Sequence, residues 1–230
     1  MSGEPCDAAL PRVAHVTPSD ELAALVRTKL ARVARDERTT TEEVIVRYAR
    51  EQLQTPPLPR GSARIVRYGR ERLLYRLSES PYRDRFVLKG AALFCLWSEE
   101  PYRPTRDIDL LGFGSFEVVE VQDIFRGVAG LRVEPDGLAF DVESVEAEEI
   151  REDAEYGGVR VKLYAYLGRA RARLQVDVGI GDAVTPGPLS ARYPTVLADF
   201  PAPELLVYPR ETVVAEKLQT ADYCQARPDQ

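Results

Sequence analysis

The chain has very little histidine and cysteine. Its one histidine among 230 residues is His15, in a proline-flanked N-terminal stretch. A Ser-His-Asp or Cys-His mechanism therefore has only a poorly placed base, which excludes a large class of hydrolases. The three cysteines, Cys6, Cys95 and Cys224, are far apart and match neither a zinc-binding spacing nor a disulfide framework. This cysteine usage fits the reducing environment of the cytoplasm.

Long apolar runs are also missing. No apolar stretch approaches the roughly 18 residues that a membrane-spanning helix needs, and the N-terminus lacks the basic and apolar regions of a signal peptide. We therefore expect a cytoplasmic protein without a membrane partner.

Basic residues are outnumbered by acidic ones, 31 to 37, and the net charge is -6. This balance does not indicate a nucleic-acid-binding protein, but clustered basic residues still permit one. Two clusters exist, and the alternative for each is a solvated helix or strand face. The first consists of Arg60, Arg64, Arg67, Arg70, Arg72 and Arg76, and the second of Arg169, Arg171 and Arg173.

The pattern of apolar residues predicts an α+β fold with an N-terminal helical region over residues 1–80 and a core over 81–230. Residues 1–18 look irregular. Helices are expected from residue 19, from residue 40 to 53 and over 63–77. The next expected elements are a strand at "RFVLKG" and a buried helix over 91–97. A strand at "RDIDLLGFG" and a helix over 116–127 follow them. Three further strands follow at "AFDVESVEAEEI", "VRVKLYAYLG" and "ARLQVDVGIG", with a hairpin turn at Gly168. Residues 186–209 carry six of the 17 prolines and should be extended or irregular, before a last helix over 211–223.

Two aspartates one residue apart, Asp107 and Asp109, are the most informative feature. Alternate residues of a strand point to the same side, so these carboxylates should project together. Burying both without a counter-charge is costly. A magnesium ion resolves the repulsion, because it is commonly held by one or two carboxylates together with substrate phosphates. Two solvated aspartates at a strand edge are the alternative.

The surroundings of these aspartates favour the metal site. The Gly90-Ala91 turn precedes an apolar helix and can offer backbone N–H groups to an anion. Asp177 lies between Val176 and Val178 in an apolar strand, where a charge needs a partner. The nearby Asp182 is read as a turn residue.

The chain resembles the AbiEii/AbiGii toxin family of nucleotidyltransferases, a branch of the DNA polymerase β-like superfamily. The segments that carry the resemblance cover roughly residues 40–223 and are "LLYRLSESPYRDRFVLKGAALFCLW", "YRPTRDIDLLGFG", "GLAFDVESVEAEEIREDAEYGGVRVKL", "LQVDVGIGDAVTPGP" and "YPRETVVAEKLQT". It implies a polymerase β-like core, a mixed sheet flanked by helices.

The resemblance also implies roles for individual residues. Asp107 and Asp109 would bind Mg²⁺, with Asp177 as the third carboxylate, either a metal ligand or an aid in deprotonating the attacking hydroxyl. Gly90 and the Ala91 N–H would hold the nucleotide phosphates. Lys217 would neutralise the triphosphate. The alternative interpretation of Lys217 is a solvated lysine on a helix. Arg103 and Thr105 would shape the same pocket, whereas Lys89 is expected to lie outside it.

Two departures from the family pattern are visible. The turn reads Gly-Ala where many members have Gly-Ser or Gly-Gly, so Ala91 lacks a hydroxyl for the phosphate. The chain ends at "CQARPDQ", whereas members usually continue into a Ser-Arg-x-Lys-Asp-type motif and further helices. The family's C-terminal helical segment is therefore expected to be missing, through truncation or degeneration.

The function expected from the resemblance is that of a magnesium-dependent toxin that transfers a nucleotide from an NTP to an acceptor hydroxyl, with RNA, notably tRNA, as acceptor. A cognate antitoxin would be its protein partner, and the arginines of residues 60–76 are the predicted contact to the RNA backbone. One alternative is a degenerate member that binds nucleotide or RNA without turnover. Another is a metal-dependent phosphatase or nuclease that uses the same carboxylates.

Overall fold

The computed structural model describes residues 62–97, 105, 107–114, 116–150, 157–181 and 184–216. The helices expected before residue 62 lie outside these residues. The described elements, in chain order, are α3 (Ser62–Ser78), the 3-10 helix η1 (Arg83–Arg85), β1 (Phe86–Lys89), the 3-10 helix η2 (Gly90–Leu93), α4 (Phe94–Trp97), β2 (Ile108–Phe113), α5 (Val118–Gly130), β3 (Leu138–Ile150), β4 (Gly158–Leu167), β5 (Ala170–Gly181), β6 (Leu189–Arg192) and β7 (Glu204–Val207). Residues 210–216 are helical.

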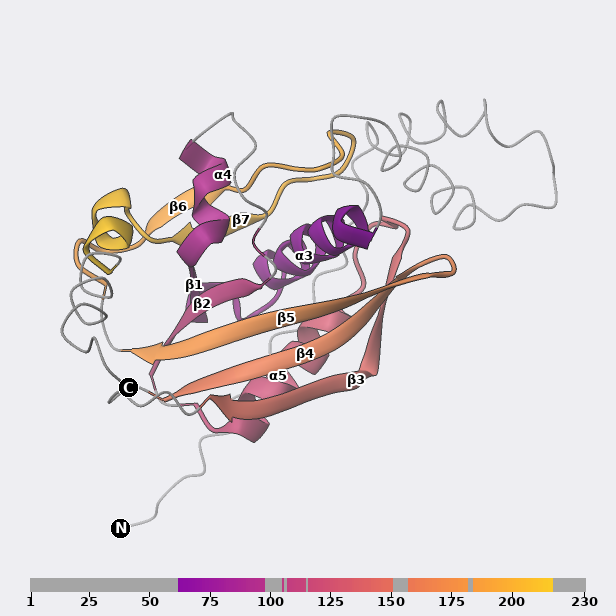
Figure 1. Ribbon diagram of the computed structural model, residues 1–230, viewed down its shortest axis with the longest axis horizontal. Helices are drawn as coiled ribbons and strands as arrows, with labels where there is room; N and C mark the ends of the chain where they lie inside the picture. Colours follow the sequence, from indigo (N-terminus) through magenta and orange to yellow (C-terminus); the bar gives the residue numbers. More distant parts are fainter. Residues whose placement is uncertain are drawn as a thin grey trace, which may run out of the picture.

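The described strands form one mixed, seven-stranded sheet in the order β3-β4-β5-β2-β1-β7-β6 (Figure 1). Strand β2 runs parallel to β5, and β1 runs parallel to β7, while the other neighbours are antiparallel. The predicted α+β class with a mixed sheet flanked by helices is confirmed. The order brings β2 and β5, which are far apart in the sequence, side by side at the centre of the sheet.

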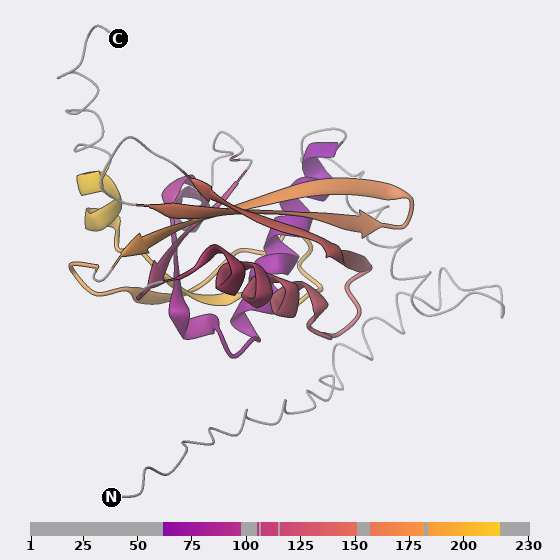
Figure 2. The same cartoon turned by 90° about the horizontal axis from the view of Figure 1, so that it is seen from below.

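The two faces of the sheet differ sharply along β4 and β5. Alternate residues of β4, from Val159 to Leu167, and of β5, from Ala172 to Val178, are buried in the core. Helices α3 and α5 pack on this buried side (Figure 2). The residues between them are polar or aromatic and point to the opposite side, as the two-residue period of a strand requires. No described element covers that opposite side of β4 and β5 in Figure 1.

Helix α3 is buried although it is rich in arginine. Arg72 and Asp136 are 1% and 2% exposed, and Arg72 donates from Nε to the Asp136 carboxylate at 3.1 Å. Arg76 donates to the same carboxylate at 2.7 Å, and Tyr68 donates to the Asp136 carbonyl at 2.8 Å. Such buried charges are tolerated because each is paired and hydrogen-bonded. The network fastens α3 to the segment before β3.

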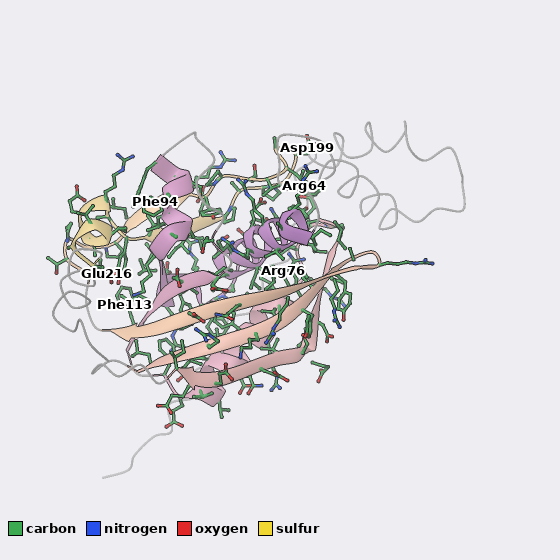
Figure 3. All side chains as sticks on the ribbon, in the orientation of Figure 1. Arg64, Arg76, Phe94, Phe113, Asp199 and Glu216 are labelled. Atoms are coloured by element: carbon green, nitrogen blue, oxygen red, sulfur yellow. The ribbon has the colours of Figure 1, made fainter. Side chains whose placement is uncertain are left out.

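Within residues 60–76, most of the arginines that the structure describes are buried. The prediction that these arginines contact RNA is therefore wrong for them. Arg64, Arg70, Arg72 and Arg76 are each at least 94% buried, so their guanidinium groups are not on an open surface. Figure 3 labels Arg64 and Arg76 on α3. Arg67 is exposed, and Arg60 lies outside the described residues. The prediction assumed that apolar residues alone form the inward face, but here ion pairs with Glu71 and Asp136 bring arginine inside.

The proline-rich segment contains two strands that were not predicted individually. β6 and β7 are four residues each, and they pair with each other and extend the sheet beyond β1. Their shortness hides the two-residue period on which strand prediction depends.

The predicted division at residue 80 stays a prediction. Helix α3, which the sequence analysis places in the N-terminal region, packs against β5 and α5. Among the described helices, none has the length and apolar character that crossing a membrane requires.

Candidate functional site

The candidate site lies where β2 meets β5. These strands are parallel, and Asp109 of β2 is in register with Asp177 of β5. Register partners on neighbouring strands point to the same face, with the strands about 4.8 Å apart. The structure therefore brings together two of the three carboxylates that the sequence indicates, from positions 68 residues apart (177 minus 109).

A row of charged residues crosses five strands at this level. Lys89 of β1 is in register with Asp109, and Arg160 of β4 with Asp177. Glu148 of β3 continues the row beyond Arg160. The row therefore reads, from β1 to β3, Lys-Asp-Asp-Arg-Glu, with the two aspartates between two cations. Lys89, which was expected to lie outside the pocket, is part of this row as the register partner of Asp109.

Arg160 is a site residue that the sequence analysis did not identify. Its Nε and Nη2 atoms donate to the two carboxylate oxygens of Asp177, both at 2.8 Å. This forked geometry is the strong form of an ion pair. It raises the pKa of Arg160. The signal in the sequence was the alternation of β4, which places residue 160 on the polar face, but register between strands could not be read from it.

Lys89 completes the other end of the row. Its Nζ lies 3.6 Å from a carboxylate oxygen of Glu216 and 5.8 Å from the ring centre of Tyr208. A Cβ placed on Gly179 would lie 3.7 Å from the same Nζ. The ammonium group therefore reaches over β5, and its charge acts on Asp109, the register partner of Lys89.

Gly90 packs directly against the carboxylate of Asp109. Its φ of +71° belongs to the left-handed region, which favours glycine. A Cβ at this position would lie 2.2 Å from Oδ2 of Asp109, so no other residue fits without moving the carboxylate. Gly90 begins η2, and the first N–H groups of such a turn lack partners within it. The turn therefore begins next to Asp109, and its contact with nucleotide phosphates stays a prediction.

The environment of Asp109 leaves negative charge poorly compensated. Burial raises the pKa of Asp109, and the charge of Asp177 raises it further, while Lys89 acts in the opposite direction. A carboxylate under these conditions gains from a bound cation. The geometry thus suits a divalent ion or the metal complex of a phosphate.

Asp107 and Thr105 lie just before β2. Asp107 is half-buried, and Thr105 donates from Oγ1 to the Asp107 carbonyl at 3.2 Å. Arg70 of α3 donates to the Thr105 carbonyl, although its own Nε has no partner among the described residues. The buried α3 therefore helps to position the segment that carries Asp107.

The remaining predicted site residues, Arg103 and Lys217, lie outside the described residues, as does Asp182. Within the described ranges, no group of three or more His, Cys, Asp or Glu side chains is arranged to hold a metal ion. That Asp107 and Asp109 form a two-carboxylate magnesium site, which is a common arrangement, stays a prediction. Asp177 as a third ligand stays a prediction, since Arg160 and Gln175 occupy its oxygens.

A mixed sheet flanked by helices, with Asp109 and Asp177 on neighbouring strands, agrees with what the resemblance to the nucleotidyltransferase family implies. The chain belongs to the AbiEii family, because the family model described as "Nucleotidyl transferase AbiEii toxin, Type IV TA system" matches residues 72–228. That family is described as one of nucleotidyltransferase toxins of type IV toxin–antitoxin systems.

Two solved structures are remotely similar. JHP933 from Helicobacter pylori is 13% identical with a TM-score of 0.42, over 70% of this chain and 58% of that one. A second H. pylori structure, described as a proposed nucleotidyltransferase, is 14% identical with a TM-score of 0.39, over 70% and 59% of the two chains. The match thus spans less than two thirds of either relative. Among curated proteins, none matches the chain.

Proposed function

We propose that the protein is a magnesium-dependent enzyme that transfers a nucleoside monophosphate from an NTP to an acceptor hydroxyl, with RNA, and tRNA in particular, as the acceptor. The observation that carries the proposal is the Asp109–Asp177 register pair beneath Gly90. Phosphoryl transfer needs positioning and charge stabilisation more than covalent participation of the protein. Carboxylates for a metal, a turn for phosphates and flanking cations supply both.

Each residue has a distinct role in this proposal. Asp107 and Asp109 would hold Mg²⁺, which would supply positive charge to neutralise and orient the phosphates. Gly90 and the Ala91 N–H contact the phosphates, and Lys89 adds positive charge beside them. Thr105 supports the Asp107 backbone. Arg103 and Lys217 are proposed to contact the triphosphate, on the strength of the family resemblance.

Asp177 has to leave its hydrogen-bonded partner Arg160 before it can take part in nucleotide transfer. Its carboxylate is held by Arg160, so a role as metal ligand or base requires the pair to open. An incoming triphosphate competes for Arg160, because a guanidinium binds phosphate with the same forked geometry. We propose that nucleotide binding moves Arg160 onto phosphate and releases Asp177. A cognate antitoxin, which the family's system implies, is the proposed partner in the cell.

A second candidate is a member that binds nucleotide or RNA without turnover. The observation that favours it is the same closed pair, because Arg160 and Gln175 satisfy Asp177 fully without a metal. The two candidates differ in product. The enzyme releases pyrophosphate and labels the acceptor, whereas the binding protein does neither.

The test incubates the protein with each α-labelled NTP in turn, magnesium and total tRNA. We expect label to enter RNA with at least one NTP, and chelation of magnesium to stop the transfer. Equilibrium binding of the same NTPs is measured in parallel. Tight, magnesium-dependent binding of an NTP with no transfer to RNA and no release of pyrophosphate would support the binding protein and contradict the enzyme.

A further inference from the structure

We propose that the open face of the β4–β5 hairpin binds the single-stranded end of an RNA acceptor. Here the hairpin face means Lys162, Tyr164 and Tyr166 of β4 together with Arg171 and Arg173 of β5. The link from this surface to nucleotide transfer rests on the proposed function, whereas RNA binding by the surface can be tested without it.

The register of the hairpin places these side chains in facing pairs. Tyr164 is in register with Arg173, and Tyr166 with Arg171. All of them lie on the face away from the core, because the residues between them, such as Leu163 and Leu174, are buried. Arg171 and Arg173 are exposed and the tyrosines are half-buried. Aromatic rings and guanidinium groups therefore alternate across a surface that none of the described elements covers.

This composition matches the chemistry of an unpaired nucleic-acid strand. The Arg171 guanidinium carbon lies over the Tyr164 ring, 4.6 Å from the ring centre, in a cation–π contact. Single-strand-binding proteins combine a basic track for the backbone with aromatic rings on which bases stack. Stacking of this kind needs bases that are not already paired. We therefore assign the surface to a single strand and not to a duplex.

The hairpin face is continuous with the candidate site. Residues 171, 173, 175 and 177 of β5 follow one another on the same face, so Arg173 lies four residues from Asp177. At about 3.3 Å per residue this separation is roughly 13 Å. A strand bound over Arg171 and Arg173 can thus extend its end toward Asp177 and Asp109.

Acidic residues limit the path of the strand on one side. Asp141, Glu146 and Glu148 of β3 share the face with β4. Glu148 is paired with Lys162, and phosphates would be repelled beyond that pair. The track we propose therefore runs over β5 and the adjoining tyrosines of β4, not over β3. This local basic track is compatible with the overall charge of -6.

The test measures binding of a short fluorescein-labelled single-stranded RNA by anisotropy at several salt concentrations. We compare wild type with an Arg171→Gln/Arg173→Gln double variant and with Tyr166→Ala. The matched control is Arg192→Gln, at an exposed position on β6. These surface changes should leave the melting temperature nearly unchanged.

We expect the double variant to weaken binding by about tenfold or more and to lower the log–log salt slope by about 1.4, since each lost phosphate contact in a single strand contributes about 0.7. Tyr166→Ala should weaken binding at least about fivefold. Wild-type binding that is absent, or unchanged in both variants, overturns the assignment. Competition by polyglutamate as effective as by RNA also overturns it, because the face would then serve an acidic protein.

The outcome is separable from that of the proposed function. Asp109→Asn should bind the RNA as wild type does while losing nucleotide transfer. In one outcome, RNA binding depends on the hairpin face while wild type transfers no nucleotide with any NTP. That result would contradict the proposed nucleotidyltransferase activity and support the RNA-binding surface. If wild type transfers nucleotides, and the hairpin variants change neither transfer nor RNA binding, the proposed enzyme activity is supported and the RNA-binding surface is rejected.

Discussion

At the scale of single residues, Gly90 and Asp109 constrain each other. The glycine has a left-handed φ of +71°, and it leaves a Cβ-sized space that the Asp109 carboxylate fills. A displacement of about 1 Å at a reacting centre can cost roughly 100-fold in rate. The orientation of the carboxylate that we propose as a metal ligand therefore depends on a residue that contributes no side chain.

Gly90→Ala should consequently reduce nucleotide transfer by about 100-fold, because the new methyl group pushes the Asp109 carboxylate aside. The control is Gly114→Ala, whose φ of +90° also lies in the positive region that strains other residues but whose Cβ meets nothing within 4 Å. Transfer rates and melting temperatures are measured for both variants. Equal loss of activity in the two would show that backbone strain, not the clash with Asp109, is responsible.

Glu71 makes stability depend on pH. Burial raises the pKa of Glu71 to about 7, although Val196 N–H and Arg72 act in the opposite direction. In the folded state this carboxyl binds a proton more tightly than in the unfolded state. Its contribution to stability is therefore full at low pH and is lost as the pH rises from about 4.5 to about 7.

The free energy of unfolding of wild type, relative to Glu71→Gln, should fall by about 2 kcal/mol between pH 5 and pH 8. Urea unfolding of both proteins at several pH values measures this difference and cancels the titration of other groups. A difference that stays constant, or that rises with pH, would show that Glu71 is ionised throughout this range.

At the scale of elements, α3 is the part whose sequence is most misleading. Its arginines suggested a surface for RNA, yet the network around Asp136 draws Arg72 and Arg76 into the core.

Asp136→Asn should destabilise the protein by about 3–5 kcal/mol, because it leaves buried guanidinium groups without their counter-charge. Asp123→Asn on α5, where the side chain is 66% exposed, should change the free energy of unfolding by less than about 0.5 kcal/mol. Chemical denaturation compares the two, and a similar small effect in both would contradict the role of the network.

The strands show what a sequence pattern can and cannot predict. The alternation of β4 and β5 and the Gly168 turn gave the hairpin and its two faces, because burial on one side imposes the two-residue period. β7 was missed as a strand, since a four-residue element carries too little of that period. Asp109 and Asp177 were recognised as site candidates, but Arg160 and Lys89 were not assigned to the site because their membership depends on register across strands.

At the scale of the whole molecule, the sheet order converts local patterns into one site. β2 and β5 become neighbours through a parallel pairing that no short segment predicts, and the pairing aligns the two aspartates. The family match over residues 72–228 runs from α3 beyond the last described strand. Within the part of the chain that the structure describes, the same order leaves one face of β4 and β5 uncovered beside the site, where we place the acceptor.

The most direct test of the account is the rate of nucleotide transfer to RNA by Asp109→Asn, measured beside Asp123→Asn. Both changes remove one negative charge, but only Asp109 faces Asp177 beneath Gly90. We predict a loss of at least about 100-fold for Asp109→Asn, as expected for removal of a group that positions charge in the transition state, and wild-type activity for Asp123→Asn. Transfer by Asp109→Asn at the wild-type rate would contradict the assignment of the site.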